Sequence, residues 1–189
     1  MTPPIGPGAF VAVVGASGVG KDSVLGYARE RAEEAVFVRR AITRPSGAGE
    51  DSHQLTEDEF ARANAAGDFA IAWRAHGLRY GLPISVDDIV RGGRMAVANV
   101  SRTVLTPLAE RYADFRLVRV SVSADVRRTR LAARGRESEA DIVTRITRAD
   151  PAPELAADLE IVNDGTIAEA GELLLEFLRG LRSNYRSVG

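Results

Sequence analysis

The chain has 189 residues, of which 45% are hydrophobic and 27% charged, and its formal net charge is −1. These values fit one globular domain, and the nearly neutral charge gives no reason to expect a nucleic acid or a membrane as partner. The absence of cysteine excludes disulfides, thiol catalysis and cysteine-ligated zinc, and without a secretory signal or an apolar run of ~18 residues we expect a cytoplasmic protein.

The first predicted element is a strand at 10–14, a continuous apolar run of the kind that is buried on both faces of a sheet. A glycine-rich segment follows it, and then a helix that is expected to reach about Glu34. A second strand is expected at 36–39. The spacing of Thr56 and Glu59 then predicts the capped start of a short helix.

The interval from about Thr43 to Leu82 breaks the alternation of strands and helices. It holds clustered glycine, serine and aspartate, and the run at 69–73 predicts the edge strand of a separate small lobe. We interpret Trp73 as part of the core of that lobe, not as a stacking platform for a ligand.

The second half of the chain returns to the alternation, and Thr166 with Glu169 caps a last helix. The expected strands are 95–98, 115–122 and 159–162, and the expected helices are 101–112 and 124–134. The pattern predicts an α/β fold with a parallel five-stranded sheet flanked by helices. In this division the core comprises 9–42 and 83–189, and the inserted lobe comprises about 43–82.

A phosphate-binding loop is predicted between the first strand and the first helix. Gly15, four further residues and then Gly20-Lys21 form the P-loop pattern in the required strand–loop–helix context. Its amides and the helix N-terminus would face the phosphates of ATP, and Lys21, the chain's single lysine, would reach the β- and γ-phosphates. The alternative is a glycine-rich turn of an ordinary α/β protein. The predicted nucleotide-binding residues are Gly15, Ala16, Ser17, Gly18, Val19, Gly20, Lys21, Asp22 and Ser23.

The candidate magnesium ligands depart from the usual motif, in which the position after the lysine carries serine or threonine. Here that position is Asp22, and Ser23 follows it. Either Ser23 supplies the hydroxyl and Asp22 holds Mg²⁺ through water, or Asp22 is only a favourable acid in the first helical turn. ATP and Mg²⁺ are the predicted cofactors, with Ser23 and Asp22 as the candidate metal ligands.

Several short motifs beyond this loop follow one another in a known order. They are Ile42-Thr43-Arg44-Pro45, Gly49-Glu50, Glu59-Phe60, His76-Gly77, Tyr80-Gly81, Arg134-Gly135-Arg136 and Asn163-Asp164. From about residue 10 to 180 the chain therefore resembles the guanylate-kinase-like branch of the P-loop nucleoside monophosphate kinases. The resemblance implies a P-loop kinase fold in which Arg44 and Tyr80 hold a phosphate of the acceptor. It also implies an arginine-rich lid at about 134–148 that closes over the transferring group.

The arginine content of the lid region supports the same interpretation. Phosphoryl transfer needs positioned cations, and arginine forks match phosphate oxygens in pairs. Ser138 with Asp141 would cap a helix that places Arg145 and Arg148 on one face. The alternative is the solvated face of an arginine-rich helix. The lid hypothesis gives catalytic roles to Arg134 and Arg145 and a nucleotide contact to Arg136. Asn163, from the last of the family motifs, is a further predicted nucleotide contact.

Departures from the guanylate kinase pattern indicate a different acceptor. Arg74 stands where that family has a guanine-reading acid, and Asn99-Val100-Ser101-Arg102 replaces its Asp-x-Asp run. Without both acids the guanine donors would stay unpaired. The same departures resemble the ribose 1,5-bisphosphate phosphokinase family. That resemblance implies ATP-dependent phosphorylation of ribose 1,5-bisphosphate to 5-phosphoribosyl 1-diphosphate, in phosphonate breakdown.

The expected partner is a small sugar phosphate bound by a monomer or a homodimer. Each histidine is as readily structural as substrate-binding, His76 included. The candidate acceptor contacts are Arg44, Tyr80, His53, Arg74, Asn99 and Arg102. Two alternatives stay open at this point: a guanylate or other nucleoside monophosphate kinase, and a non-catalytic guanylate-kinase-like module that captures phosphorylated peptides.

Overall fold

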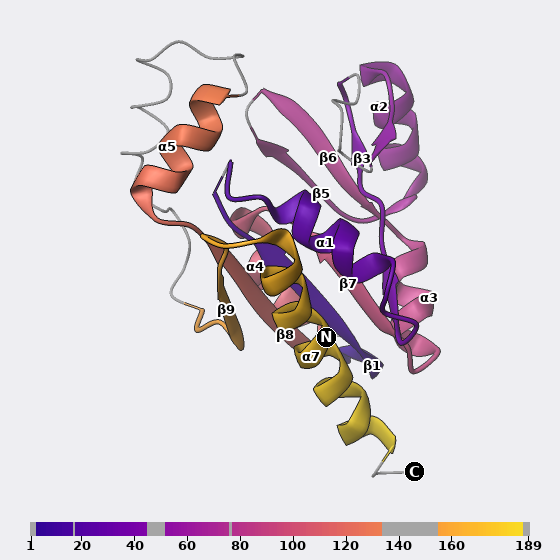
Figure 1. Cartoon of the computed structure of the whole chain (residues 1–189). Helices are drawn as coiled ribbons and strands as arrows, with labels where there is room; N and C mark the ends of the chain where they lie inside the picture. The colour runs from indigo at the N-terminus through magenta and orange to yellow at the C-terminus, as the bar shows by residue number, and fades with distance from the viewer. Residues whose placement is uncertain (1–2, 17, 45–51, 76, 134–154, 187–189) are drawn as a thin grey trace.

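A computed structural model describes residues 3–16, 18–44, 52–75, 77–133 and 155–186 of the chain (Figure 1). Its main sheet has five parallel strands in the order β2-β7-β1-β8-β9. The strands are β1 (Ile5–Val14), β2 (Ala35–Phe37), β7 (Met95–Asn99), β8 (Tyr112–Ser121) and β9 (Leu159–Val162). The predicted α/β fold with a parallel five-stranded sheet is therefore confirmed.

Helices cover both faces of this sheet because the side chains of each strand alternate between them. On one face, Val11 and Val13 of β1 pack with α1 (Lys21–Arg29) and α7 (Ile167–Arg186). On the other face, Phe10 and Ala12 pack with α3 (Ser85–Arg91) and α4 (Leu105–Arg111). The result is a three-layer core with β1 buried at its centre (Figure 1).

A second, four-stranded sheet lies beside the core, with the order β4-β3-β6-β5. The strands of this sheet are β3 (Ala41–Ile42), β4 (His53–Gln54), β5 (Phe69–Ala75) and β6 (Leu78–Pro83). The helix α2 (Glu57–Ala66) lies between β4 and β5 in the chain. As predicted, β5 is an edge strand and Trp73 is buried in the lobe, where its ring stacks on Tyr80 at a centroid distance of 5.4 Å. The predicted cap of α2 is also present, since Thr56 and Glu59 form a reciprocal capping box.

Some predicted boundaries are wrong. The first helix ends at Arg29 and not at about Glu34, because the chain must reverse direction before β2 starts at Ala35. The expected helix at 101–112 is a 3₁₀ turn η1 (Arg102–Val104) followed by α4, and Tyr112 starts β8 instead. Tyr112 joins the sheet because it pairs with Ile5.

Other elements either were not expected at all or agree with the expectation. Neither α3 nor β6 was expected from the sequence, whereas α5 (Ala124–Ala133) agrees with the predicted helix within the described range. No helix in the described ranges combines the length and apolar character that a bilayer span requires.

Candidate active site

The carboxyl ends of the parallel strands place the predicted phosphate loop at one edge of the main sheet. Gly15 follows β1 directly, and a Cβ atom on it would lie 2.3 Å from the Val120 carbonyl oxygen of the neighbouring strand β8. Gly18 and Gly20 have φ angles of 85° and 86°, in the left-handed region that glycine adopts at little cost. Three glycines are thus required by the backbone path itself.

The loop ends at a helix start that has no side-chain cap. Gly20 is the N-cap of α1, and it has no side chain that could form a capping hydrogen bond. The first amides of a helix have no partner within the helix, so those of α1 are available to an anion at the loop. The Lys21 ammonium donates to the carbonyl oxygens of Gly15 at 2.7 Å and Ala16 at 3.0 Å, so this side chain folds back over the loop.

Asn163, which follows β9, contacts the backbone of the phosphate loop. It is fully buried, and its Nδ2 donates to the Val19 carbonyl oxygen at 2.8 Å. The sequence suggested that Asn163 contacts the nucleotide, whereas the geometry gives its amide to the backbone of the phosphate loop. This hydrogen bond ties Asn163 to the loop, and the nucleotide contact of Asn163 stays a prediction.

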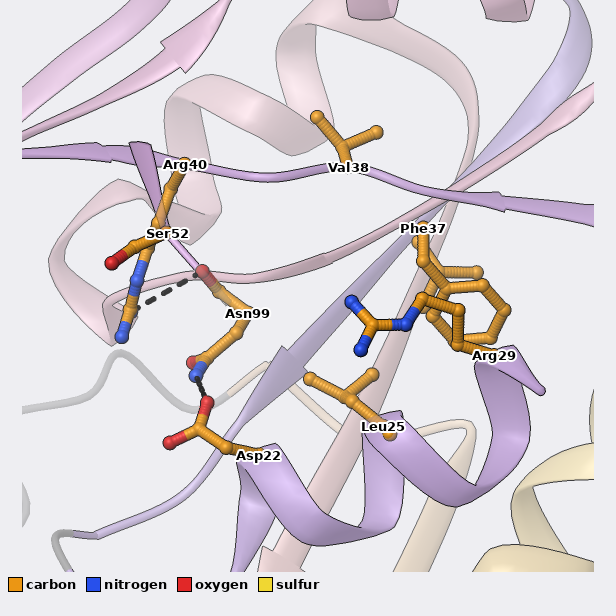
Figure 2. Close-up of a pocket in the computed structure, with 10 residues that line it drawn as sticks. Asp22, Leu25, Arg29, Phe37, Val38, Arg40, Ser52 and Asn99 are labelled. Carbon is orange, nitrogen blue, oxygen red and sulfur yellow. Dashed lines mark hydrogen bonds between the residues drawn. The ribbon is translucent and has the colours of Figure 1, made fainter. Parts of the chain in front are cut away.

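A cavity of about 140 Å³ opens beside the loop, between α1, the segment after β2, and the end of β7 (Figure 2). Asp22, Arg40, Ser52 and Asn99 lie at one end of the cavity, and Leu25, Arg29 and Phe37 lie toward the other end (Figure 2). The lining residues are Asp22, Leu25, Gly26, Arg29, Phe37, Val38, Arg40, Ser52, Val97 and Asn99.

Two predicted site residues meet at this cavity. Asn99 is the last residue of β7, and its Nδ2 donates to Asp22 Oδ1 at 2.8 Å (Figure 2). The sequence assigned Asp22 to the nucleotide or its metal and Asn99 to the acceptor. Their hydrogen bond joins the two predicted subsites into one continuous site.

Arg40, which sequence reasoning missed, is placed at the same end of the cavity. Its guanidinium lies 5.2 Å from the centroid of the Tyr80 ring and 3.5 Å from the Asn99 carbonyl oxygen. None of the salt bridges among the described residues involves Arg40. Arg29 and the buried Ser52 also line the cavity and were missed.

The sequence carried only a partial signal for Arg40. It follows β2 closely, and the carboxyl ends of parallel strands carry the ligand sites of open α/β sheets. Nothing local distinguishes Arg40 from Arg39, whose side chain is exposed.

The other predicted acceptor residues lie on the second sheet or next to it. Ile42 pairs with Tyr80, so the chain brings Arg44 and Tyr80 into the same region, and Arg102 is half-buried in η1 near β5. His53 and Arg74 are exposed on their strands. The structure thus groups Arg40, Asn99 and Tyr80 by direct contacts, while His53 and Arg74 have no such contacts with the cavity.

Several predicted residues lie outside the described residues. They are Ser17, His76, Arg134, Arg136, Ser138, Asp141, Arg145 and Arg148.

Comparisons with known proteins identify close relatives. The chain is 58% identical over 179 residues to a ribose 1,5-bisphosphate phosphokinase PhnN of Pseudofrankia inefficax, covering 94% of each protein. It is 46% identical over 182 residues to the protein of the same name from Chelativorans, covering 93% of this chain and 87% of that protein.

More distant comparisons agree on the fold. A crystal structure of guanylate kinase from Anaplasma phagocytophilum superposes with a TM-score of 0.62 at 19% identity, covering 95% of this chain and 88% of that one. No protein-family model matches the chain.

Proposed function

The chain belongs to the ribose 1,5-bisphosphate phosphokinase family, and from that membership we propose that it phosphorylates the 1-phosphate of ribose 1,5-bisphosphate with ATP. An oxygen of the 1-phosphate forms a bond to the γ-phosphorus, and the bond from that phosphorus to the β–γ bridging oxygen breaks. The products are ADP and 5-phosphoribosyl 1-diphosphate. The attacking oxygen is already ionised at neutral pH, so the reaction needs no general base.

The phosphate loop supports the donor half of this proposal. The amides at the start of α1 hold the ATP phosphates, and Lys21 moves from the Gly15 and Ala16 carbonyls to the β- and γ-phosphates. Bound Mg²⁺ would neutralise charge on the phosphate oxygens, and the Asp22 carboxylate at the loop is the kind of oxygen ligand that this ion prefers. Arg134, Arg136 and Arg145 keep their proposed lid roles from the sequence.

The chemistry of the cavity supports the acceptor half, and the position of Arg40 is the observation that carries it. Arg40 and Asn99 line the cavity with a guanidinium and an amide, whereas reading guanine requires carboxylates. The cavity's carboxylate, Asp22, already accepts a hydrogen bond from Asn99. Because guanidinium groups bind phosphate through charge-assisted hydrogen bonds, this cavity favours an anionic sugar phosphate. Arg44 and Tyr80 extend the proposed phosphate contacts from the second sheet.

A parallel assay of acceptors tests the proposal. The chain is incubated with ATP, Mg²⁺ and one of ribose 1,5-bisphosphate, ribose 5-phosphate or GMP, and the products are followed by ³¹P NMR. We expect a diphosphate signal with ribose 1,5-bisphosphate and little turnover of the other two. Faster phosphorylation of GMP, or the absence of any diphosphate product, would refute the proposal.

A further inference from the structure

Two residues next to the phosphate loop are paired in an unusual way. Asp22 follows Lys21 in the first turn of α1, and Asn99 ends β7, the strand beside β1. The register pairs Asn99 with Val13, so Asn99 lies at the level where β1 enters the loop. The 2.8 Å hydrogen bond from Asn99 Nδ2 to Asp22 Oδ1 links the helix start to the end of this strand.

The residue types at these two positions are the reverse of the common arrangement. In P-loop phosphotransferases, a hydroxyl directly after the lysine and a carboxylate from an aspartate in the Walker B segment hold the Mg²⁺ of the nucleotide. Here the helix start carries the carboxylate, and the end of a neighbouring strand carries a neutral amide. The site therefore keeps one negative charge, on the helix.

We propose that helix and strand have exchanged these roles: Asp22 is the carboxylate that faces the Mg²⁺ of bound ATP, and Asn99 is a positioning residue that orients it. The proposal rests on the proposed use of ATP. The Asn99 amide fixes Asp22 Oδ1, and Asp22 Oδ2 makes no hydrogen bond within the described ranges, so this oxygen can face the metal. Asn99 contributes no charge of its own.

The chemistry of magnesium agrees with such a sparse site. Mg²⁺ keeps several waters and is commonly bound by one or two carboxylates together with substrate phosphates. Among the described residues, no group of three acids or histidines that would hold a metal without a substrate is present. One carboxylate beside the phosphate loop is what a nucleotide-delivered Mg²⁺ requires.

Asp22 also lines the cavity proposed for the acceptor, and this position suggests a competing role. In that role its carboxylate would accept hydrogen bonds from ribose hydroxyls, and the metal would be held elsewhere. The two roles differ in what a change of Asp22 alters: the Mg²⁺ requirement for nucleotide binding in the first, and the KM of the acceptor in the second.

The exchange of residues suggests its own test. Calorimetry measures binding of a non-hydrolysable ATP analogue to the chain over a series of Mg²⁺ concentrations. The variants are Asp22→Asn, Asp22→Ser, Asn99→Asp and the double variant Asp22→Ser/Asn99→Asp. Asp125→Asn removes an acid from the first turn of α5 and is the matched control. Thermal melting confirms that each variant is folded.

We expect Asp22→Asn and Asp22→Ser to need about tenfold more Mg²⁺ for half-maximal binding, a loss typical of a changed metal environment. Asn99→Asp alone should also raise the Mg²⁺ concentration needed for half-maximal binding, because ionising two adjacent carboxylates is unfavourable. The double variant restores one hydroxyl and one carboxylate, so its Mg²⁺ requirement should return to within about threefold of the original. Asp125→Asn should behave as the unchanged chain does.

Two outcomes would overturn the inference: an unaltered Mg²⁺ requirement in Asp22→Asn, as the competing role in acceptor binding predicts, or a double variant whose Mg²⁺ requirement is no lower than that of Asp22→Ser. Failure of the unchanged chain to bind the analogue at any Mg²⁺ concentration is a different result. It would contradict the proposed function itself, and the inference with it.

Discussion

At the scale of single residues, the site depends on two cationic side chains, and only one of them can be identified from the sequence. Lys21 is visible because it sits in a glycine-rich loop between a strand and a helix. Arg40 is not, because its importance comes from contacts with Tyr80 and the Asn99 carbonyl, which are distant in the chain. Lys21 supports a prediction about phosphoryl transfer from ATP, and Arg40 supports one about binding of the acceptor.

Replacing Lys21 by alanine should lower kcat by a factor of at least about 100, because the ammonium stabilises charge that develops in the transition state. Lys21 is only partly buried and bonds to loop carbonyls, so the melting temperature should change little. Steady-state kinetics and thermal melting measure the two effects. An unchanged kcat would contradict the assignment of the loop.

Replacing Arg40 by methionine should raise the KM for ribose 1,5-bisphosphate by a factor of roughly 10 to 100, the loss of one charge-assisted hydrogen bond. The KM for ATP should stay within about twofold, since Arg40 belongs to the cavity and not to the phosphate loop. Arg39→Met changes the exposed neighbour and is the matched control. Equal effects of the two substitutions on the acceptor KM would show that Arg40 has no special contact.

At the scale of elements, local chemistry fixes some helix starts firmly. The Thr56 and Thr166 caps were predicted from spacing alone, and both capping boxes are present. Glu59 Oε2 accepts from the Thr56 backbone N–H at 2.7 Å, and Glu169 Oε2 accepts from that of Thr166 at the same distance. These hydrogen bonds, together with those from the threonine hydroxyls, lower the pKa of both glutamates below the usual value of 4.5.

These two carboxylates should contribute to an acid-sensitive part of the stability. A group whose pKa is lowered by folding stabilises the fold above its unfolded pKa, and this contribution is lost as the pH falls through the lowered value. The double variant Glu59→Gln/Glu169→Gln should therefore melt below the original chain at pH 7. The gap should shrink as the pH falls from about 4.5, where the glutamates become neutral like glutamine. Melting curves between pH 7 and pH 3 would show a constant gap if the charges are irrelevant.

At the scale of the whole molecule, the site and the main buried ion pair lie at opposite edges of the sheet. The phosphate loop and Asn99 follow the carboxyl ends of strands, whereas Tyr112 starts β8 and pairs with Ile5 at the start of β1. There the buried Asp87 of α3 accepts hydrogen bonds from Tyr112 Oη at 2.9 Å and from Arg111 Nε at 3.0 Å. Burial and the bond to Asp87 raise the pKa of Tyr112, so this residue stays neutral.

Breaking the hydrogen bonds between Asp87, Arg111 and Tyr112 should therefore lower the free energy of unfolding and leave kcat/KM unchanged. Arg111→Met leaves the Asp87 charge buried without its main partner and should cost about 3 kcal/mol of unfolding free energy. Denaturant unfolding measures the loss, and kcat/KM should stay unchanged. Arg116→Met, which removes a more exposed ion pair to Asp114 and Asp158, should cost at most about 1 kcal/mol. Similar losses in both variants would contradict the importance assigned to burial.

The sequence by itself determined the alternation of strands and helices in the core, the parallel sheet, the pattern of the phosphate loop and the family, because these follow from local apolar runs, glycine spacing and short ordered motifs. It placed Asp22 and Asn99 in the site but not beside each other, and it did not find Arg40. The end of α1 and the start of β8 at Tyr112 also escaped it. Only the tertiary structure decided these points, because strand order and register bring residues distant in the chain into contact, and no local pattern encodes which pairs will meet.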